Sequence, residues 1–234
     1  MCPITTSHTS AHRAARERAS ALAASAHVTE TLRLVEMRAL LPEPTPRVAL
    51  RTFALFLLHF HLSEFILVVR FNPRSAGLRS LCLSRSYCVA MSLGVLEFYV
   101  EHAMLGELKE RWTASAYGFG VFMCVFGEWL RKSAMITAGT SFTHEVQTSR
   151  RAAHVLVRDG VYAHARHPGY LGWFIWAVGT QVIMANAMSA VAFAIVTWRF
   201  FKRRIAFEEM MLREMFPDYD VYAKRTRTWI PFIK

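Results

Sequence analysis

Long apolar segments are the feature of this chain that most constrains its fold. Three of them, "VALRTFALFLLHFHLSEFILVV" (48–69), "SYCVAMSLGVLEFYVEHAML" (86–105) and "ASAYGFGVFMCVFGEWL" (114–130), are close to the length of about 20 residues that a helix needs to cross a bilayer. The apolar stretch 170–201 is too long for one span and long enough for two, so we predict a helical hairpin that turns near Ala185 and Asn186. The segments together predict an all-α, polytopic integral membrane protein with about five transmembrane helices.

Composition supports this class. The 234 residues are 53% hydrophobic, which is high for a soluble protein, and the formal net charge is +11. The arginines lie at the ends of the apolar segments, which suits anionic lipid headgroups better than a nucleic-acid groove, so we expect membrane lipid and no nucleic acid as partners. The four cysteines have neither zinc-ligand spacing nor a disulfide pattern, and we expect no metal site. Glu97, Glu101 and His102 require the 86–105 helix to turn one face toward protein.

The ends of the chain differ from its middle. Residues 1–47 form an Ala/Arg-rich tail that we expect to be disordered or amphipathic, and residues 48–234 form the membrane domain. The basic tail after residue 201 predicts a cytosolic C-terminus. Because a hairpin at 170–201 returns the chain to the side that it left, the polar interval 131–169 should face the cytosol too. We therefore expect a cytosol-facing pocket built from these two segments.

The start of the hairpin is the strongest candidate for a binding site. Pro168 stands where a helix would begin, and Arg166 and His167 precede it directly. Free N–H groups at a helix start, with two cationic side chains beside them, make a receptor for a carboxylate or a phosphate. The alternative is that Arg166 and His167 merely reach out to lipid headgroups. On the next segment, Arg204 and Glu208 are four residues apart and share one helical face, as a simple surface ion pair also would.

The motifs of the C-terminal half carry a family resemblance. They are "FHLSE" with "NPRS", "GEWLRKSAMITAGTSFTHEVQ", "HVLVRDGVYAHARHPGYLGWFIWAVGTQ", "TWRFFKRR", "FPDYDVYAKRT" and a final "IPFIK". From about residue 50 onward the chain resembles the isoprenylcysteine carboxyl methyltransferases. Those membrane enzymes use S-adenosylmethionine to methylate the C-terminal prenylcysteine of processed CaaX proteins, and S-adenosylhomocysteine is the product.

The resemblance implies a site, a location and partners. It implies multi-pass insertion in the endoplasmic reticulum membrane, with the active site facing the cytosol. The implied partners are the farnesyl- or geranylgeranyl-cysteine ends of small GTPases and other CaaX proteins. Arg131 and Arg204 would clamp the acceptor carboxylate, because arginine offers a planar, bidentate fork. The residues implied to bind S-adenosylmethionine are Gln147, His154, Leu156, Val157, Gly160, Tyr162, Arg166, His167, Pro168, Tyr170, Glu208 and Glu209.

Two other functions stay open at this stage. A related membrane methyltransferase could act on a phospholipid amine, although two arginines are the wrong clamp for a cationic acceptor. A non-catalytic membrane scaffold that binds sterol or lipid could keep the same fold. Binding of S-adenosylhomocysteine would separate the scaffold from an enzyme.

Overall fold

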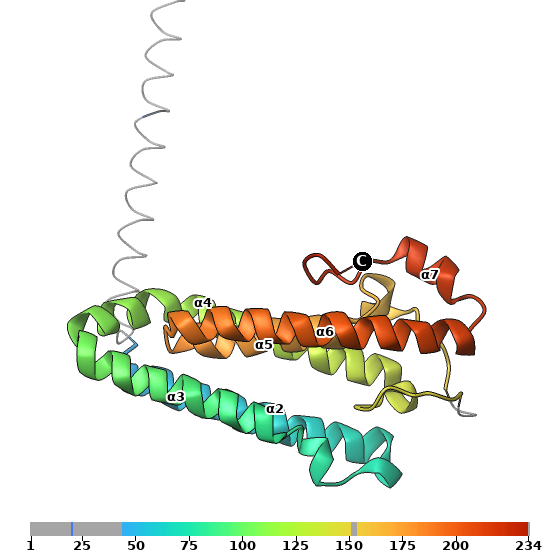
Figure 1. Ribbon diagram of the computed structural model, residues 1–234, viewed down its shortest axis with the longest axis horizontal. Helices are drawn as coiled ribbons and strands as arrows, with labels where there is room; N and C mark the ends of the chain where they lie inside the picture. Colours follow the sequence, from blue (N-terminus) through green and yellow to red (C-terminus); the bar gives the residue numbers. More distant parts are fainter. Residues whose placement is uncertain (1–19, 21–43, 151–153, 234) are drawn as a thin grey trace, which may run out of the picture. The chain divides into compact units, whose positions relative to one another are not determined.

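The computed structural model describes Ser20 and residues 44–150 and 154–233, and the residues from 44 onward form a bundle of helices (Figure 1). Nearly all of the predicted tail 1–47 lies outside the described residues. One isolated parallel bridge, between Ala165 and Arg227, is the β-type pairing in the described part. The α-helices are α2 (Pro46–Phe71), α3 (Arg85–Leu105), α4 (Glu107–Ala138), α5 (Pro168–Ile183), α6 (Ala187–Met215) and α7 (Tyr219–Arg225). Short 3-10 helices are η1 (Pro73–Ser75), η2 (Leu78–Leu81), η3 (Gly139–Ser141) and η4 (Gly160–Ala163).

The predicted apolar segments are helical in the structure. The segments 48–69 and 86–105 correspond to α2 and α3, and 114–130 is the middle of the longer α4. The predicted hairpin is confirmed, because α5 ends at Ile183, α6 begins at Ala187, and Ala185 turns the chain with a φ of 52°. Two helical stretches of the described residues are long and apolar enough to cross a membrane. One is α2 (Pro46–Phe71), with a mean hydropathy of 1.9, and the other is Leu78–Leu105, which runs from η2 to the end of α3 and has a mean hydropathy of 1.3.

Helix boundaries follow from local chemistry. Thr45 caps α2 through its side chain, which accepts a hydrogen bond from the Val48 N–H at 3.4 Å, and Pro46 occupies the first helical turn. Gly106, with a φ of 49°, lies between α3 and α4, and Gly139, with a φ of 53°, ends α4. Positive φ is accessible to glycine at little cost, so the chain reverses between α3 and α4 without a long loop.

Helices α4 and α5 approach each other closely along glycines. A Cβ atom on Gly127 would lie 2.6 Å from the Gly172 carbonyl oxygen and 2.6 Å from the Trp176 nitrogen. A Cβ on Gly179 would lie 2.8 Å from the Cβ of Met123. Small residues at such an interface let two backbones pack directly, which is how membrane helices gain contact without a hydrophobic drive. This contact fixes the start of α5 against α4.

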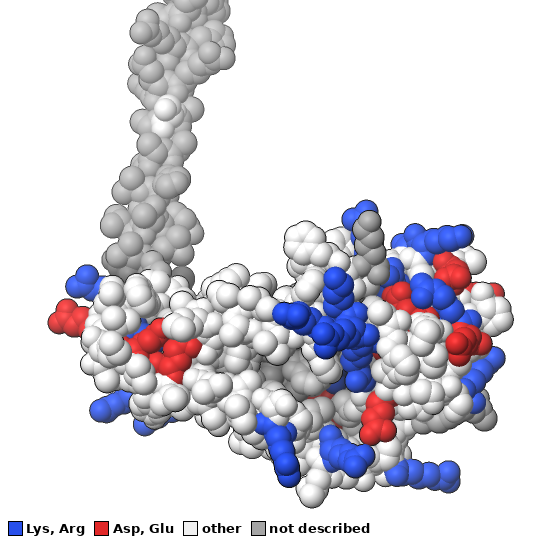
Figure 2. Space-filling model, viewed as in Figure 1, with Lys and Arg blue, Asp and Glu red and all other residues white. Residues whose placement is uncertain are grey.

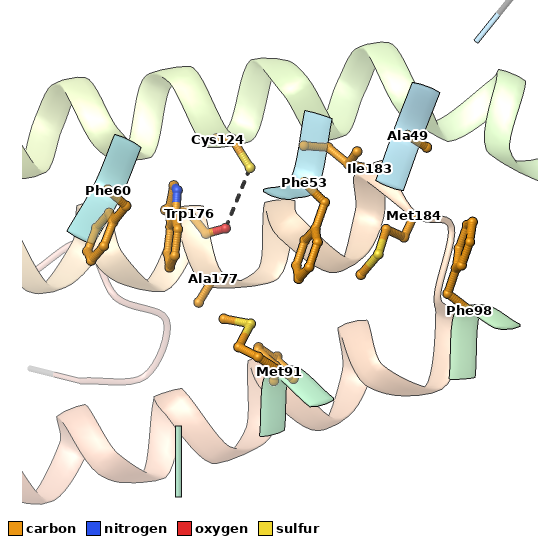
Figure 3. Close-up of a cluster of buried hydrophobic side chains, with 11 residues drawn as sticks. Ala49, Phe53, Phe60, Met91, Phe98, Cys124, Trp176, Ala177, Ile183 and Met184 are labelled. Atoms are coloured by element: carbon orange, nitrogen blue, oxygen red, sulfur yellow. Dashed lines mark hydrogen bonds between the residues drawn. The ribbon is translucent and has the colours of Figure 1, made fainter. Parts of the chain in front are cut away.

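The main core fills the space between α2, α3, α4 and α5 (Figure 3). Phe60 of α2 stacks on Trp176 of α5 with ring centroids 4.0 Å apart, and Cys124 of α4 contacts the Trp176 carbonyl at 3.7 Å. Figure 3 shows Met91 and Phe98 of α3 reaching toward the same cluster. A large apolar cluster of this kind holds α2 and α3 to the α4–α5 pair.

A buried polar network joins the turns at the far end of the bundle. Lys109, which is 0% exposed, donates to Glu101 at 2.5 Å, to the Ala185 carbonyl at 3.0 Å and to Asn186 Oδ1 at 3.2 Å. Glu97 accepts from the N–H groups of Met188 and Ser189, at 2.9 and 2.8 Å, at the start of α6.

The expectation of a protein-facing side is therefore confirmed for Glu97 and Glu101, whereas His102 is exposed. A buried charge needs such partners, and here they tie the α3–α4 turn to the α5–α6 turn. A cleft lies at the opposite end of the bundle.

Candidate functional site

A cleft lies at the end of the bundle where α5 begins. The empty space inside it, counted together with the open solvent at its mouth, is about 810 Å³. Of the twelve residues predicted to bind a cofactor, those that line the cleft are Gln147, His154, Leu156, Val157, Tyr162, Arg166, His167, Tyr170 and Glu208. The walls also carry side chains that were not predicted to bind a cofactor, including Phe142, Leu212, Met215, Tyr219 and Tyr222.

Three predicted cofactor residues do not line the cleft. Gly160 turns the chain into η4 with a φ of 56°, so its role is conformational. Pro168 is buried and opens α5, as predicted. Glu209 is buried in an ion-pair cluster, because α6 points two consecutive side chains in different directions.

A tyrosine joins the two charged residues of α6 that were predicted to share a face. Arg204 Nε donates to the Tyr170 hydroxyl at 2.8 Å, and the same hydroxyl donates to Glu208. Arg204 also donates through Nη2 to the His144 carbonyl, and its guanidinium lies 5.3 Å from the Tyr170 ring centroid. The described ion pairs do not include Arg204 with Glu208, so the simple surface pair is not formed. The guanidinium is instead held in one orientation at the edge of the cleft.

Arg166 and His167 differ from the expectation of two free cationic donors. Arg166 Nε donates to Glu209 at 2.8 Å, and His167 Nε2 lies 3.2 Å from the same oxygen. Arg166 also donates to the Ala223 carbonyl at 3.1 Å and to the Thr226 carbonyl. The reason is charge balance, since the buried Glu209 carboxylate needs cations around it.

This cluster fixes the ionisation of Glu209. Hydrogen bonds and charge from His167 and Arg166 outweigh the opposing effect of burial and lower the pKa of Glu209 to about 2. Arg213 extends the cluster toward solvent, with Nη2 3.3 Å from Glu209 and Nε 2.9 Å from Asp220. Glu209 is therefore a carboxylate at every ordinary pH, and it ties the start of α5 to the C-terminal segment.

The start of α5 offers fewer free donors than predicted. The Tyr170 N–H donates to the His167 carbonyl at 3.0 Å, so that group is used within the chain. A Cβ on Gly169 would lie 3.3 Å from Arg131 Nη1 and 3.6 Å from the Ala134 Cβ, so the helix start packs tightly on α4. An anion receptor of the predicted kind would depend on the remaining Gly169 N–H and on side chains.

A second cluster of charges surrounds Glu64, behind the helix start. Arg131 is 1% exposed and donates to both oxygens of Glu64, at 3.0 and 2.9 Å, and to the Gly169 carbonyl at 3.2 Å. Lys132 Nζ lies 2.7 Å from Glu64, and His144 Nε2 lies 2.6 Å from it. The guanidinium fork of Arg131 is therefore occupied, which differs from the expectation that it clamps an acceptor carboxylate.

Glu64, Cys82 and His144 place potential metal-ligand atoms within 4.8 Å of one another. Arg131 and Lys132 both pair with the Glu64 carboxylate, so it already carries two cations. A further cation would be repelled at this position. The group acts as a buried ion cluster that braces α2 and α4 behind the cleft.

Sequence reasoning missed the roles of Glu64 and His144, although both lie inside motifs that carry the family resemblance. The sequence did carry a signal for Glu64, because it is an acidic residue inside an apolar segment of membrane-spanning length. Such a residue must find a polar or charged partner within the protein. Nothing in the sequence reveals that the partner is Arg131, 67 residues away. His144 links the Glu64 cluster to Arg204, because its ring contacts Glu64 and its carbonyl accepts from Arg204.

Comparison with known proteins decides the family. The sequence profile of the isoprenylcysteine carboxyl methyltransferase (ICMT) family matches residues 120–214. A probable protein-S-isoprenylcysteine O-methyltransferase of Oryza sativa subsp. indica is 45% identical over 184 residues, which cover 78% of this chain and 95% of that protein. The chain belongs to the ICMT family. Protein-S-isoprenylcysteine O-methyltransferase B of Arabidopsis thaliana is also 45% identical, over 76% of this chain and 91% of the relative.

Vertebrate and solved relatives agree with this assignment. The Homo sapiens protein-S-isoprenylcysteine O-methyltransferase is 45% identical over 75% of this chain, which corresponds to 62% of the human protein. The solved structure of a eukaryotic intramembrane Ras methyltransferase ICMT matches with a TM-score of 0.77 and 36% identity, over 82% of this chain and 70% of that one. As an ICMT family member, the chain places its profile-matched region, from α4 to the end of α6, around the cleft.

Proposed function

We propose that this chain transfers a methyl group from S-adenosylmethionine to the C-terminal carboxylate of farnesyl- or geranylgeranyl-cysteine on CaaX proteins such as small GTPases. The observation that carries the proposal is the Tyr170 hydroxyl, which holds Arg204 and Glu208 together at the edge of the cleft. This arrangement puts an oriented guanidinium beside a carboxylate that faces the cavity. Family membership supplies the reaction class.

The lining of the cleft fits S-adenosylmethionine. Leu156, Val157, Leu212 and Met215 give it apolar walls of the kind that an adenine ring needs, and Glu208 and Gln147 give it polar groups for ribose hydroxyls and an amino group. When bound, this cofactor would supply an electrophilic methyl group. Three predicted residues outside the lining keep supporting roles: Gly160 and Pro168 shape the backbone, and Glu209 holds Arg166 and His167 in place.

Arg204 is the proposed clamp for the acceptor carboxylate. Its Nε and Nη2 are anchored to Tyr170 and to the His144 carbonyl, so the guanidinium cannot drift when a substrate binds. A guanidinium offers five N–H donors, and these two anchors leave others available for a carboxylate. Arg131 is assigned to positioning instead, because it joins Glu64 to the Gly169 carbonyl at the start of α5.

The acceptor needs no general base. A C-terminal carboxyl group has an ordinary pKa of about 3.5, so it is ionised at neutral pH. The chain has to align the carboxylate and exclude water around it, and alignment is what the Arg204 anchors supply. The same arginine argues against a phospholipid amine as acceptor, since it would repel a protonated amine.

The prenyl group and the protein chain fit a membrane placement. We propose about five spans, with the hairpin crossing over residues 170–201 and the cleft on the cytosolic side of the endoplasmic reticulum membrane. Exposed apolar side chains cover α2, α3 and the first part of α6, as at Leu58, Ile66, Val89 and Val196. A surface of that kind requires lipid around it.

The test compares acceptors directly. Membranes that contain the chain are incubated with labelled S-adenosylmethionine and either N-acetyl-farnesylcysteine or phosphatidylethanolamine, and base-labile methyl ester is counted against methylated lipid. We expect ester formation on the prenylcysteine alone. Methylated lipid without ester would favour the phospholipid enzyme, and neither product would favour the scaffold.

Cofactor binding is tested apart from turnover. His167 contacts Glu209 and stacks on Tyr170 with ring centroids 5.5 Å apart, so His167→Ala should loosen the cleft wall. We expect weaker binding of S-adenosylhomocysteine by calorimetry, with membrane insertion unchanged. Equal affinity in the variant and the parent chain would contradict the placement of the cofactor in this cleft.

A further inference from the structure

The last described residues form a loop that points two aromatic side chains outward. We call residues 226–233 the C-terminal loop; in it Trp229 is 61% exposed and Phe232 is 92% exposed. Both residues have a φ of 60°, a left-handed backbone that is an outlier for bulky side chains. The structure therefore holds these rings in solvent-facing positions against the preference of the backbone.

Several hydrogen bonds brace this loop. The Trp229 indole N–H donates to the His164 carbonyl at 2.7 Å, and the Thr228 hydroxyl donates to the Ile233 carbonyl at 2.5 Å. The Ile233 N–H donates to the Ile230 carbonyl at 3.2 Å. A loop held by these bonds presents a fixed surface, and that surface is apolar at its tip.

The C-terminal loop packs against the middle of α6. The Trp198 indole N–H donates to the Pro231 carbonyl at 2.6 Å, and Ile230 is buried against Phe201 and Ile205. Figure 1 shows the end of the chain returning alongside α6. The outward rings are thereby held at the level of residues 198–205.

The surface of α6 changes its chemistry at that same level. Before it, exposed side chains are apolar, as at Ile195 and Val196. At it, Arg199, Lys202 and Arg203 are all exposed, and α6 carries no acidic residue from 187 to 207. Figure 2 shows Lys and Arg side chains gathered on this face of the molecule. Exposed apolar residues that give way to cations mark the boundary between lipid tails and headgroups.

We propose that the C-terminal loop, together with Arg199, Lys202 and Arg203, binds anionic phospholipid headgroups of the surrounding membrane. Phe232 and Trp229 would insert their rings into the interfacial layer, where aromatic side chains are favoured, and the three cations would hold the phosphates. Lys202 is already set beside an aromatic ring, since its Nζ lies 4.9 Å from the Trp198 ring centroid. This proposal rests on the membrane placement proposed above and not on methyl transfer.

The same loop contacts Arg166, so lipid binding at the loop would also affect a residue of the cleft wall. The Arg166 N–H donates to the Arg227 carbonyl at 3.0 Å, and the Arg166 side chain donates to the Thr226 carbonyl. Arg166 lines the cleft. An anchored loop would hold Arg166 in place, and anionic lipid should therefore tighten cofactor binding.

Native mass spectrometry of the purified full chain measures the proposed binding directly. The chain in detergent is titrated with phosphatidylserine or phosphatidylcholine, and the dissociation constants of the first bound lipids are compared. The variants are Lys202→Gln with Arg203→Gln, and Phe232→Ser alone. Arg111→Gln is the matched control, because its side chain is 79% exposed and lies on α4.

We expect phosphatidylserine to bind more tightly than phosphatidylcholine, and the double variant to lose about fivefold or more of that affinity, since each surface cation contributes to headgroup attraction. Phe232→Ser should lower affinity for both lipids, and the control should match the parent. All of these side chains are exposed, so the thermal unfolding midpoint should stay unchanged. Equal affinity for the two lipids, or an unchanged preference in the double variant, would overturn the proposal whatever the chain methylates.

Discussion

Replacement of Arg204 by lysine tests the proposed acceptor clamp most directly. Lysine keeps the positive charge but replaces a planar fork with a single ammonium group on a flexible stem. In the structure the guanidinium is fixed by two bonds, one from Nε to the Tyr170 hydroxyl at 2.8 Å and one from Nη2 to the His144 carbonyl. One ammonium cannot keep both anchors and also align an acceptor.

The size of the effect follows from these contacts. A hydrogen bond that involves a charged group is worth about 1.5–3 kcal/mol. Loss of one such bond in the aligned state corresponds to a fall of about 10- to 150-fold in kcat, since about 1.4 kcal/mol is a factor of ten. Binding of S-adenosylhomocysteine should change much less, because Arg204 does not line the cofactor cleft.

The assay measures kcat with N-acetyl-farnesylcysteine and, separately, the affinity for S-adenosylhomocysteine. Arg111→Lys is the control, since Arg111 is exposed and makes one surface pair with Glu107 at 3.9 Å. Near-normal turnover in Arg204→Lys would refute the clamp. A large loss of cofactor affinity with normal kcat would show that Arg204 supports the cofactor instead.

Three further outcomes are expected. Glu209→Gln should lower the thermal unfolding midpoint equally at pH 6 and pH 8. In the folded chain the pKa of Glu209 is about 2, whereas its ordinary value is near 4.5. The ionised carboxylate therefore stabilises the fold fully above pH 4.5, and this stabilisation is lost only as the pH falls toward 2. Gly127→Ala should cost about 1–3 kcal/mol by overpacking the α4–α5 contact, seen as a lower unfolding midpoint in detergent. Lys109→Met should cost about 3 kcal/mol by leaving Glu101 without its buried partner, and the double variant with Glu101→Gln should recover part of that loss.

The helices of this fold could be read from the sequence because they depend on local properties. Apolar length located α2 and α3, and the combination of length with a polar break located the α5–α6 turn at Ala185. Helix ends were less predictable, since α4 runs from Glu107 to Ala138, well beyond its apolar middle. The extra turns are polar, and tertiary contacts such as the Lys109 network hold them.

The candidate site was predicted as a set of residues but not as a set of pairs. Nine of the twelve expected cofactor residues line one cleft, because family motifs record which positions matter. The motifs do not record that Arg131 binds Glu64 or that Arg166 binds Glu209. Such pairs join segments far apart in the chain, and only the packing of α2, α4, α5 and α6 determines them.

Glu208 and Glu209 show how the fold gives two adjacent carboxylates different tasks. Consecutive residues on a helix point in directions about 100° apart. Glu209 turns into the bundle, where Arg166, His167 and Arg213 neutralise it. Glu208 turns into the cleft, where its partner is the neutral Tyr170 hydroxyl, and no ion pair among the described residues includes it.

The charge balance of the cleft follows from this division. Because Arg166 and His167 are matched by Glu209, they add little net positive charge to the cavity. Glu208 remains as a carboxylate that faces the cavity without a cationic partner among the described ion pairs. Such a cavity favours a ligand with a net positive part, and the amino and sulfonium groups of S-adenosylmethionine supply one. Arg204 lies on the other side of the Tyr170 hydroxyl and is placed to attract the negative charge of a carboxylate acceptor. The Tyr170 hydroxyl therefore lies between Glu208, on the proposed cofactor side, and Arg204, on the proposed acceptor side.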